Sequence, residues 1–176
     1  MSKSNLSIEL QALSLRRNLM QKEVAIDAKI PATTASGYFT GTSDVPIAKA
    51  AEIAETSGDD MFAGQLAYNY FGFLKSLDGP IADICSIAEL GIFQKKESTE
   101  RKQNEPYVSQ LLAESKVRQL DGDESRMVQQ YGMEYLDEII VEVAMAIEVF
   151  EVAGITLRDA IRMKMPEWKS KKYMRG

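Results

Sequence analysis

Helix caps and turn residues recur so closely in the first 77 residues that only short helices fit between them. Pro31 suits the first turn of a helix and Gly41 the position just past its end, so residues 32–40 are predicted to form one. Similar signals bound four further predicted helices, at residues 6–17, 21–28, 47–56 and 61–77. Because no segment shows the period-two alternation of strands, the predicted fold class is all-α, with a five-helix N-terminal domain.

Fewer signals interrupt the second half, where we predict longer helices and a linker. The charged run at residues 94–105, QKKESTERKQNE, lacks large apolar side chains and is predicted to be a solvated hinge. Helices are expected at residues 81–93, 106–120, 124–153 and 157–165, the last of them ended by Pro166. The predicted domains are therefore residues 1–78, then a helix and charged linker at 79–105, and a helical C-terminal domain with a basic tail at 106–176.

Residue composition excludes several classes of chemistry. The chain has no histidine and one cysteine, which removes Ser-His and Cys-His nucleophiles and most zinc ligands. Cys85 lies in an apolar run and is interpreted as a small buried thiol. We predict no catalytic residue, no cofactor and no metal. The N-terminus lacks the apolar core of a signal peptide, so a cytoplasmic protein without a membrane partner is expected.

Charge is distributed unevenly along a chain whose net charge is −5. Residues 1–60 hold six Lys/Arg and eight Asp/Glu, and residues 61–157 hold eight and sixteen. Residues 158–176 hold seven Lys/Arg and two Asp/Glu, so basic character is confined to the C-terminal tail. Any attraction of the N-terminal region to phosphate must come from locally placed residues and from helix N-termini.

Residues 21–41 have the pattern of a helix-turn-helix, in which a supporting helix holds a second helix against the major groove of DNA. Ala25 is the small residue required where the two helices touch. Apolar residues fall at the turn and on the inner face of the second helix, namely Ile30, Ala35 and Tyr38. Polar residues fall on its outer face at helical spacing, namely Thr33, Ser36 and Thr40. A helical hairpin with an ordinary core is the alternative interpretation of this stretch.

The same stretch, QKEVAIDAKIPATTASGYFTG, resembles the helix-turn-helix of the Cro/CI (XRE) class of transcriptional regulators. The positions that match in register are Gln21, Val24, Ala25, Phe39 and Gly41. The flanking segments LSLRRNLM and VPIAKAAEIAETSGDD resemble the first and fourth helices of the class. The resemblance implies a sequence-specific DNA-binding transcriptional regulator of the prophage-repressor type. Its expected partners are a double-stranded DNA operator, a second copy of itself in a dimer or higher oligomer, and a protein antirepressor.

The resemblance also implies which residues contact DNA. Gln21 corresponds to a phosphate contact, Thr40 to another, and the base contacts correspond to Ala32, Thr33 and Ser36. The full predicted DNA-binding set is Gln21, Lys22, Ala32, Thr33, Thr34, Ser36, Gly37 and Thr40.

Two residues depart from the pattern of the class. Lys29 replaces the turn glycine and must adopt a left-handed conformation or reshape the turn. Ala32 replaces a base-reading glutamine, so specificity is expected to depend on threonine, methyl contacts and DNA shape.

Broad apolar faces in two of the predicted helices suggest assembly. Residues 61–77 carry a stripe that either completes the N-terminal core or pairs subunits, and residues 124–153 carry a face wide enough for a bundle or a dimer seam. We therefore predict that the C-terminal region oligomerises. Trp168 is interpreted as an anchor of the tail on the core. For the basic tail, contact with DNA phosphate or an acidic partner and contact with neither are equally favoured.

One alternative function comes from a second resemblance. The segment from residue 136 to residue 174 is similar to the last helices of MazG-like nucleotide pyrophosphohydrolases, which hold magnesium with Glu-x-x-Glu and Glu-x-x-Asp motifs. The aligned pair here is Glu138 and Val141, so one ligand is missing.

Other carboxylates keep the spacing of those motifs. Glu134-x-x-Asp137 lies one turn earlier, but its partner Glu97-x-x-Glu100 falls in the predicted linker. Glu134, Glu138 and Glu142 are accordingly interpreted as a solvated helix face. A third hypothesis is an antirepressor-type interaction module without DNA affinity, which the acidic N-terminal half favours.

Overall fold

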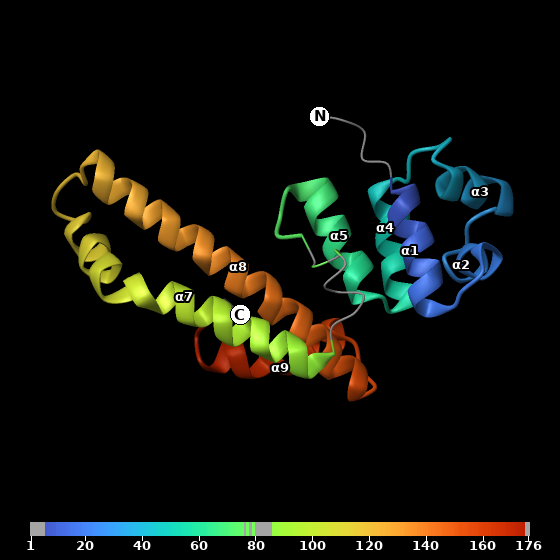
Figure 1. Ribbon diagram of the computed structural model, residues 1–176. Coiled ribbons are helices and arrows are strands. Elements are labelled where there is room, and N and C mark those ends of the chain that lie inside the picture. Colours follow the sequence, from blue (N-terminus) through green and yellow to red (C-terminus); the bar gives the residue numbers. More distant parts are fainter. Residues whose placement is uncertain (1–5, 76, 78, 80–85, 175–176) are drawn as a thin grey trace. The chain divides into compact units, whose positions relative to one another are not determined.

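The computed structural model describes residues 6–75, 77, 79 and 86–174, and all regular structure in these residues is helical (Figure 1). The predicted all-α class is confirmed. The chain forms two compact units, one made of residues 1–76 together with 150–176 and the other of residues 77–149. None of the helices in the described ranges is long and apolar enough to cross a membrane.

Five short helices form most of the first unit. They are α1 (Ser7–Arg17), α2 (Gln21–Asp27), α3 (Ala32–Thr40), α4 (Ile47–Ser57) and α5 (Asp60–Phe71). The first four agree with the predicted ranges to within one residue at each end. The fifth is shorter than predicted, because Gly72 adopts a left-handed φ of 63° and ends the helix before Phe73.

One apolar core joins these five helices. α1 contacts α3 and α5, and α2 contacts α3 and α4. Leu10, Leu13, Ile53 and Phe62 are fully buried at its centre. α5 contributes Phe62 and Leu66, with Tyr70 packed against them, so the stripe of α5 completes the N-terminal core as far as the helix extends.

A buried carboxylate connects α1 to α5. Asp59 is the N-cap of α5 and accepts a hydrogen bond of 2.8 Å from the Phe62 amide. Its other oxygen accepts one of 2.9 Å from the Arg16 guanidinium at the end of α1. The charge of Asp59 is therefore both paired and hydrogen-bonded, as burial requires.

The C-terminal helix belongs to the same unit as the first five. α9 (Leu157–Ser170) begins at Thr156, whose hydroxyl accepts a hydrogen bond from the Asp159 amide as the predicted cap requires. The Leu157 amide donates to Asp60 across 2.5 Å and the Arg158 guanidinium donates to the Ala54 carbonyl across 3.0 Å. The predicted C-terminal domain of residues 106–176 is therefore divided, because residues 150–176 belong to the same unit as the N-terminal helices.

Pro166 lies inside α9, so the prediction that it terminates the helix is wrong. The missing amide removes one backbone hydrogen bond. Ion pairs of Glu167 with Lys164 and Lys171 span the following turn. The helix therefore continues past the proline on an exposed surface.

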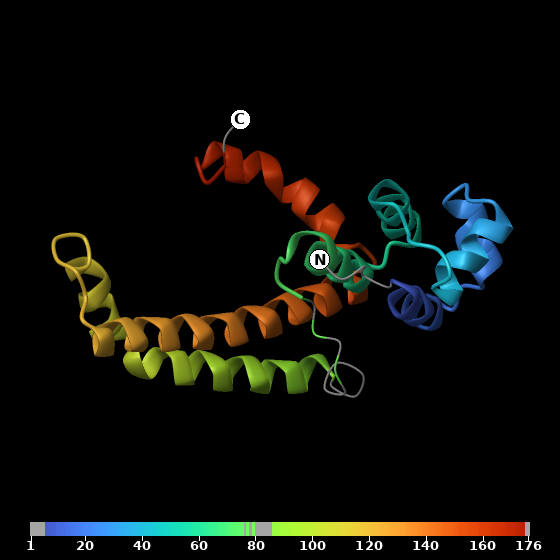
Figure 2. The same ribbon diagram turned by 90° about the horizontal axis from the view of Figure 1, so that it is seen from above.

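Two long helices, α7 (Ile87–Glu114) and α8 (Gly122–Val152), form the second unit up to Val149. Both views show α7 and α8 running side by side in opposite directions (Figures 1 and 2). The predicted hinge at residues 94–105 is helical and lies within α7, as does Pro106, which was expected to begin a new helix. Residues 81–85, with Cys85 and most of the first turn of the predicted sixth helix, lie outside the described residues.

Pairing with α8 explains why the charged run is helical. Lys96 pairs with Glu100, and Arg101 with Glu105, in each case one helical turn further along the chain. Ion pairs at this spacing support a helix that has no apolar stripe. Gln94 donates to Glu142 of α8, and Arg101 forms an ion pair with Glu138. These contacts join residues far apart in the chain, and local sequence patterns do not report them.

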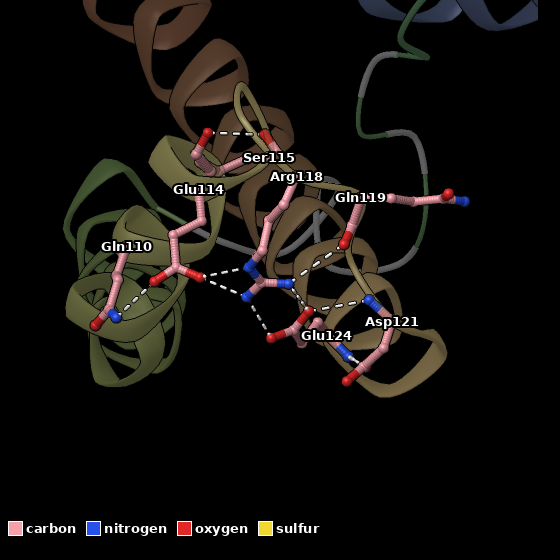
Figure 3. A network of polar contacts seen from close by, with 8 residues as sticks. Gln110, Glu114, Ser115, Arg118, Gln119, Asp121 and Glu124 are labelled. Atoms are coloured by element: carbon pink, nitrogen blue, oxygen red, sulfur yellow. Dashed lines mark hydrogen bonds and ion pairs between the residues drawn. The ribbon is translucent and has the colours of Figure 1, made fainter.

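A polar network joins the two helices at the tip of the hairpin (Figure 3). Arg118 binds both Glu114 at the end of α7 and Glu124 in the first turn of α8. Asp121 accepts a 2.8 Å hydrogen bond from the Glu124 amide, and the Glu124 side chain accepts one of 2.9 Å from the Asp121 amide. The network caps α8 and fixes the direction in which it leaves the turn.

Candidate DNA-binding helices

The turn between α2 and α3 has a left-handed lysine. Lys29 has a φ of 51°, which confirms the first of the two predicted solutions for this position. Its amide donates to the Ile26 carbonyl across 3.1 Å, and the Ile30 amide donates to the Ala25 carbonyl across 2.8 Å. These two bonds satisfy the last carbonyls of α2 and set the angle at which α3 begins.

Four buried side chains hold α3 against the supporting helix and the rest of the core. Ala25 is buried where α2 contacts α3, and Ile30, Ala35 and Tyr38 are buried at the turn and on the inner face of α3, as predicted. Because these positions fix the rotation of α3 about its axis, the opposite face of the helix is held in one orientation toward solvent.

The outer face of α3 carries several hydroxyl groups. Thr33 and Ser36 are exposed and Thr34 is half-buried. None of their hydroxyls forms a hydrogen bond with any residue that the structure describes. Ala32 is also exposed, at the first position of the helix. This face therefore offers free donors and acceptors together with methyl groups, the chemistry required for contacts with base edges.

Two of the predicted contact residues are used within the protein. The Thr40 hydroxyl donates to the Ser36 carbonyl across 2.8 Å, so its hydrogen is not free for a phosphate oxygen. At Gly37 an added Cβ would lie 2.7 Å from the Ser43 hydroxyl oxygen. The absence of a side chain at Gly37 thus lets the α3–α4 loop pack on the helix, and the Ser43 amide donates to the Gly37 carbonyl across 3.1 Å.

The start of α2 leaves Gln21 and Lys22 available. Glu23 accepts a 2.7 Å hydrogen bond from the Met20 amide and so caps the helix. Gln21 is half-buried at the first position of α2 and Lys22 is exposed, and neither side chain has a partner among the described residues. Both can reach a ligand without breaking a hydrogen bond or ion pair to any described residue.

Unpaired positive charge in the N-terminal helices is confined to the same region. Of the lysines and arginines in residues 6–60, three are paired: Arg16 with Asp59, Arg17 with Glu151 and Lys49 with Glu52. The remaining two, Lys22 and Lys29, form no ion pair within these described residues and lie at the two ends of α2. The first amides of α3 add partial positive charge, because its N-cap, Pro31, supplies no capping side chain.

A second polar cluster lies between α7 and α8. Carboxylate oxygens of Glu97, Glu134 and Asp137 all lie within 4.8 Å of one another. The prediction that Glu97 lies in a solvated linker is therefore wrong, and the Glu-x-x-Asp spacing at residues 134–137 faces a glutamate from the neighbouring helix. Lys96 contacts Glu97 and partly neutralises this cluster.

Glu138, predicted to be part of a solvated face, is instead buried against α7. Its carboxylate pairs with Arg101, and the two side chains are 8% and 11% exposed. Arg101 also donates to the Tyr131 hydroxyl across 2.7 Å and lies over the ring of Tyr135 at 4.7 Å. Burial acts to raise the pKa of Glu138, but hydrogen bonds from Arg101 and Ser98 outweigh it and keep the pKa below its ordinary value.

Comparisons of the chain with protein-family models, with curated proteins and with solved structures find no match.

Proposed function

We propose that the protein is a sequence-specific DNA-binding transcriptional regulator that binds an operator through α3. The observation that carries the proposal is the outer face of α3. On this face the hydroxyls of Thr33 and Ser36 have no hydrogen-bond partner among the described residues, and buried residues fix the orientation of the helix. Lys22 and Lys29 beside it, which form no ion pair with the described residues, supply local positive charge in an N-terminal region that is acidic overall.

Binding divides between positioning and base recognition. Gln21, Lys22, Lys29 and the first amides of α3 contact phosphate oxygens and set the position of the protein on the duplex. Thr33 and Ser36 then contact base edges in the major groove, and the methyl group of Ala32 packs on a thymine methyl. Thr40 contributes less than its position suggests, because its hydroxyl already donates within α3.

A binding assay tests this proposal against its rivals. The purified protein is titrated into DNA from its own upstream region and into a scrambled duplex of equal length, across a series of salt concentrations. Preferential binding that weakens with salt is the expected result. Equal binding of both duplexes contradicts operator recognition, and no binding at low salt favours a protein-interaction module of the antirepressor type.

A second candidate function, magnesium-dependent hydrolysis of a nucleotide, is favoured by the convergence of Glu97, Glu134 and Asp137. Three carboxylates at this separation have the oxygen chemistry that Mg²⁺ prefers. Because Glu138 is already paired with Arg101, the test substitutes carboxylates of the cluster instead. Under this hypothesis, pyrophosphate release from nucleoside triphosphates requires Mg²⁺ and is lost in Glu134→Gln and Asp137→Asn. Glu105→Gln, an acidic residue of α7 outside the cluster, is the control.

A further inference from the structure

α8 carries an apolar stripe that the described residues of the second unit leave partly exposed. Met133, Leu136, Ile140 and Val143 recur at alternating spacings of three and four residues, which places them on one face of the helix. Glu138, on another face, pairs with α7. Met133 and Leu136 are 50% and 48% exposed, and the other two are half-buried.

α9 carries a second uncovered apolar surface. An open groove of about 510 Å³ runs along it, and apolar side chains line it except at Lys164. Its walls include Phe150 from the end of α8, and Ile161 and Trp168 from α9. No side chain of α9 is buried, although contacts of Leu157 and Arg158 hold the start of the helix on α4 and α5. A helix of this kind normally covers its apolar face with a partner.

The two segments that carry these surfaces have opposite net charge. Residues 127–157 contain six Asp/Glu and no Lys/Arg, whereas residues 157–174 contain six Lys/Arg and two Asp/Glu. On the basic surface, the side chains of Lys169 and Lys172 form no ion pair with any described residue. The acidic segment that carries the apolar stripe and the basic segment that carries the apolar groove are therefore complementary in charge.

We propose that two copies of the chain form a dimer in which the groove on α9 of each copy receives the α8 stripe of the other. A two-fold axis makes the two contacts equivalent, so the assembly closes as a dimer. The acidic α8 would be repelled by anionic lipid, which makes a membrane the poorer occupant. The interface does not require that α3 binds DNA, although a dimer is what a palindromic operator requires.

Disulfide trapping tests the proposed pairing in the full-length chain. In a Cys85→Ser background, Leu136→Cys and Ile161→Cys are introduced together and the protein is oxidised. We expect a covalent dimer on a non-reducing gel, because the proposed interface brings residue 136 of one copy against residue 161 of the other. Ile92→Cys combined with Ile161→Cys is the control, because Ile92 is 70% exposed on α7 outside the stripe. A product cross-linked within one chain would overturn the proposal.

Solution mass gives an independent test that does not depend on new cysteines. Sedimentation equilibrium of the unmodified chain should give a dimer, with the dissociation constant raised roughly tenfold or more in Leu136→Asp and Ile161→Asp. Ile92→Asp should leave it unchanged, and circular dichroism confirms that each variant is folded.

A monomer at concentrations on the order of 100 µM overturns the proposal. So does an Ile161→Asp variant that dimerises like the unmodified chain, or a monomer that floats with anionic vesicles. Thr33→Ala and Ser36→Ala should change DNA binding but not solution mass, so failure of the proposed function and failure of this interface are distinguishable.

Discussion

Arg158 in α9 donates a hydrogen bond of 3.0 Å to the carbonyl oxygen of Ala54 in the last turn of α4. Carbonyls in the last turn of a helix lack intrahelical partners and carry partial negative charge, so a guanidinium there is stabilising. Arg162, one turn further along α9, pairs with Glu55. The C-terminal segment therefore contributes to the stability of the helices that carry the candidate DNA-binding face.

Arg158→Ala is expected to lower the free energy of unfolding of the first unit by about 1–2 kcal/mol, because it removes a hydrogen bond from a charged donor. Urea unfolding followed by the fluorescence of Trp168, the single tryptophan, measures this unit directly. Lys49→Ala, which removes a surface ion pair with Glu52 in the same unit, is the control and should change stability by less than about 0.5 kcal/mol. Equal effects of the two substitutions would contradict a structural role for Arg158.

Lys29→Gly should stabilise the turn between α2 and α3. A lysine at a φ of 51° carries the left-handed strain that glycine avoids, so the substitution should add about 1 kcal/mol. Lys29→Ala is the matched control, because it removes the same charge but keeps a Cβ. We expect Lys29→Gly to raise the melting temperature above that of Lys29→Ala, and both to weaken DNA binding. Equal melting temperatures would contradict the strained turn.

Acid should weaken the tip of the α7–α8 hairpin. Hydrogen bonds from Arg118 and from the Asp121 amide lower the pKa of Glu124 to about 2. Because this pKa is below the unfolded value of about 4.3, the carboxylate contributes its stability above that pH and loses it as pH falls toward 2. Carboxyl NMR titration should show Glu124 still ionised at pH 3, and its pKa should return toward 4.3 in Arg118→Ala. An ordinary pKa in the unmodified chain would contradict the network.

Local signals in the sequence were sufficient for the first four helices and for the inner face of α3. Pro31, Gly41 and Asp59 lie at the helix ends that their residue types favour, and Ala25 and Ala35 are buried as their spacing requires. The left-handed conformation of Lys29 was one of the two alternatives that the sequence left open, and the φ of 51° decides between them.

Contacts between distant residues could not be predicted in the same way. Residues 94–105 have no apolar stripe, and their helix depends on partners such as Glu138, which follows Arg101 by 37 residues. Because residues 94–105 were predicted to be a linker, the proximity of Glu97 to Asp137 was not predicted, although the spacing of each carboxylate motif was visible in the sequence. Likewise, nothing near Arg158 in the sequence indicates Ala54, which precedes it by 104 residues.

Base recognition by the outer face of α3 is the central claim, and one comparison tests it most directly. Affinity for the best duplex selected from a random pool is measured by fluorescence anisotropy, against a scrambled duplex, for the unmodified chain, Thr33→Ala, Ser36→Ala and Lys22→Ala. We predict that Thr33→Ala and Ser36→Ala each reduce the preference for the selected duplex by about 1–3 kcal/mol. Lys22→Ala should weaken binding to both duplexes alike. It should also reduce the slope of log affinity against log salt concentration by about one. Unchanged preference in both α3 variants would contradict the assignment of α3 as the helix that contacts bases.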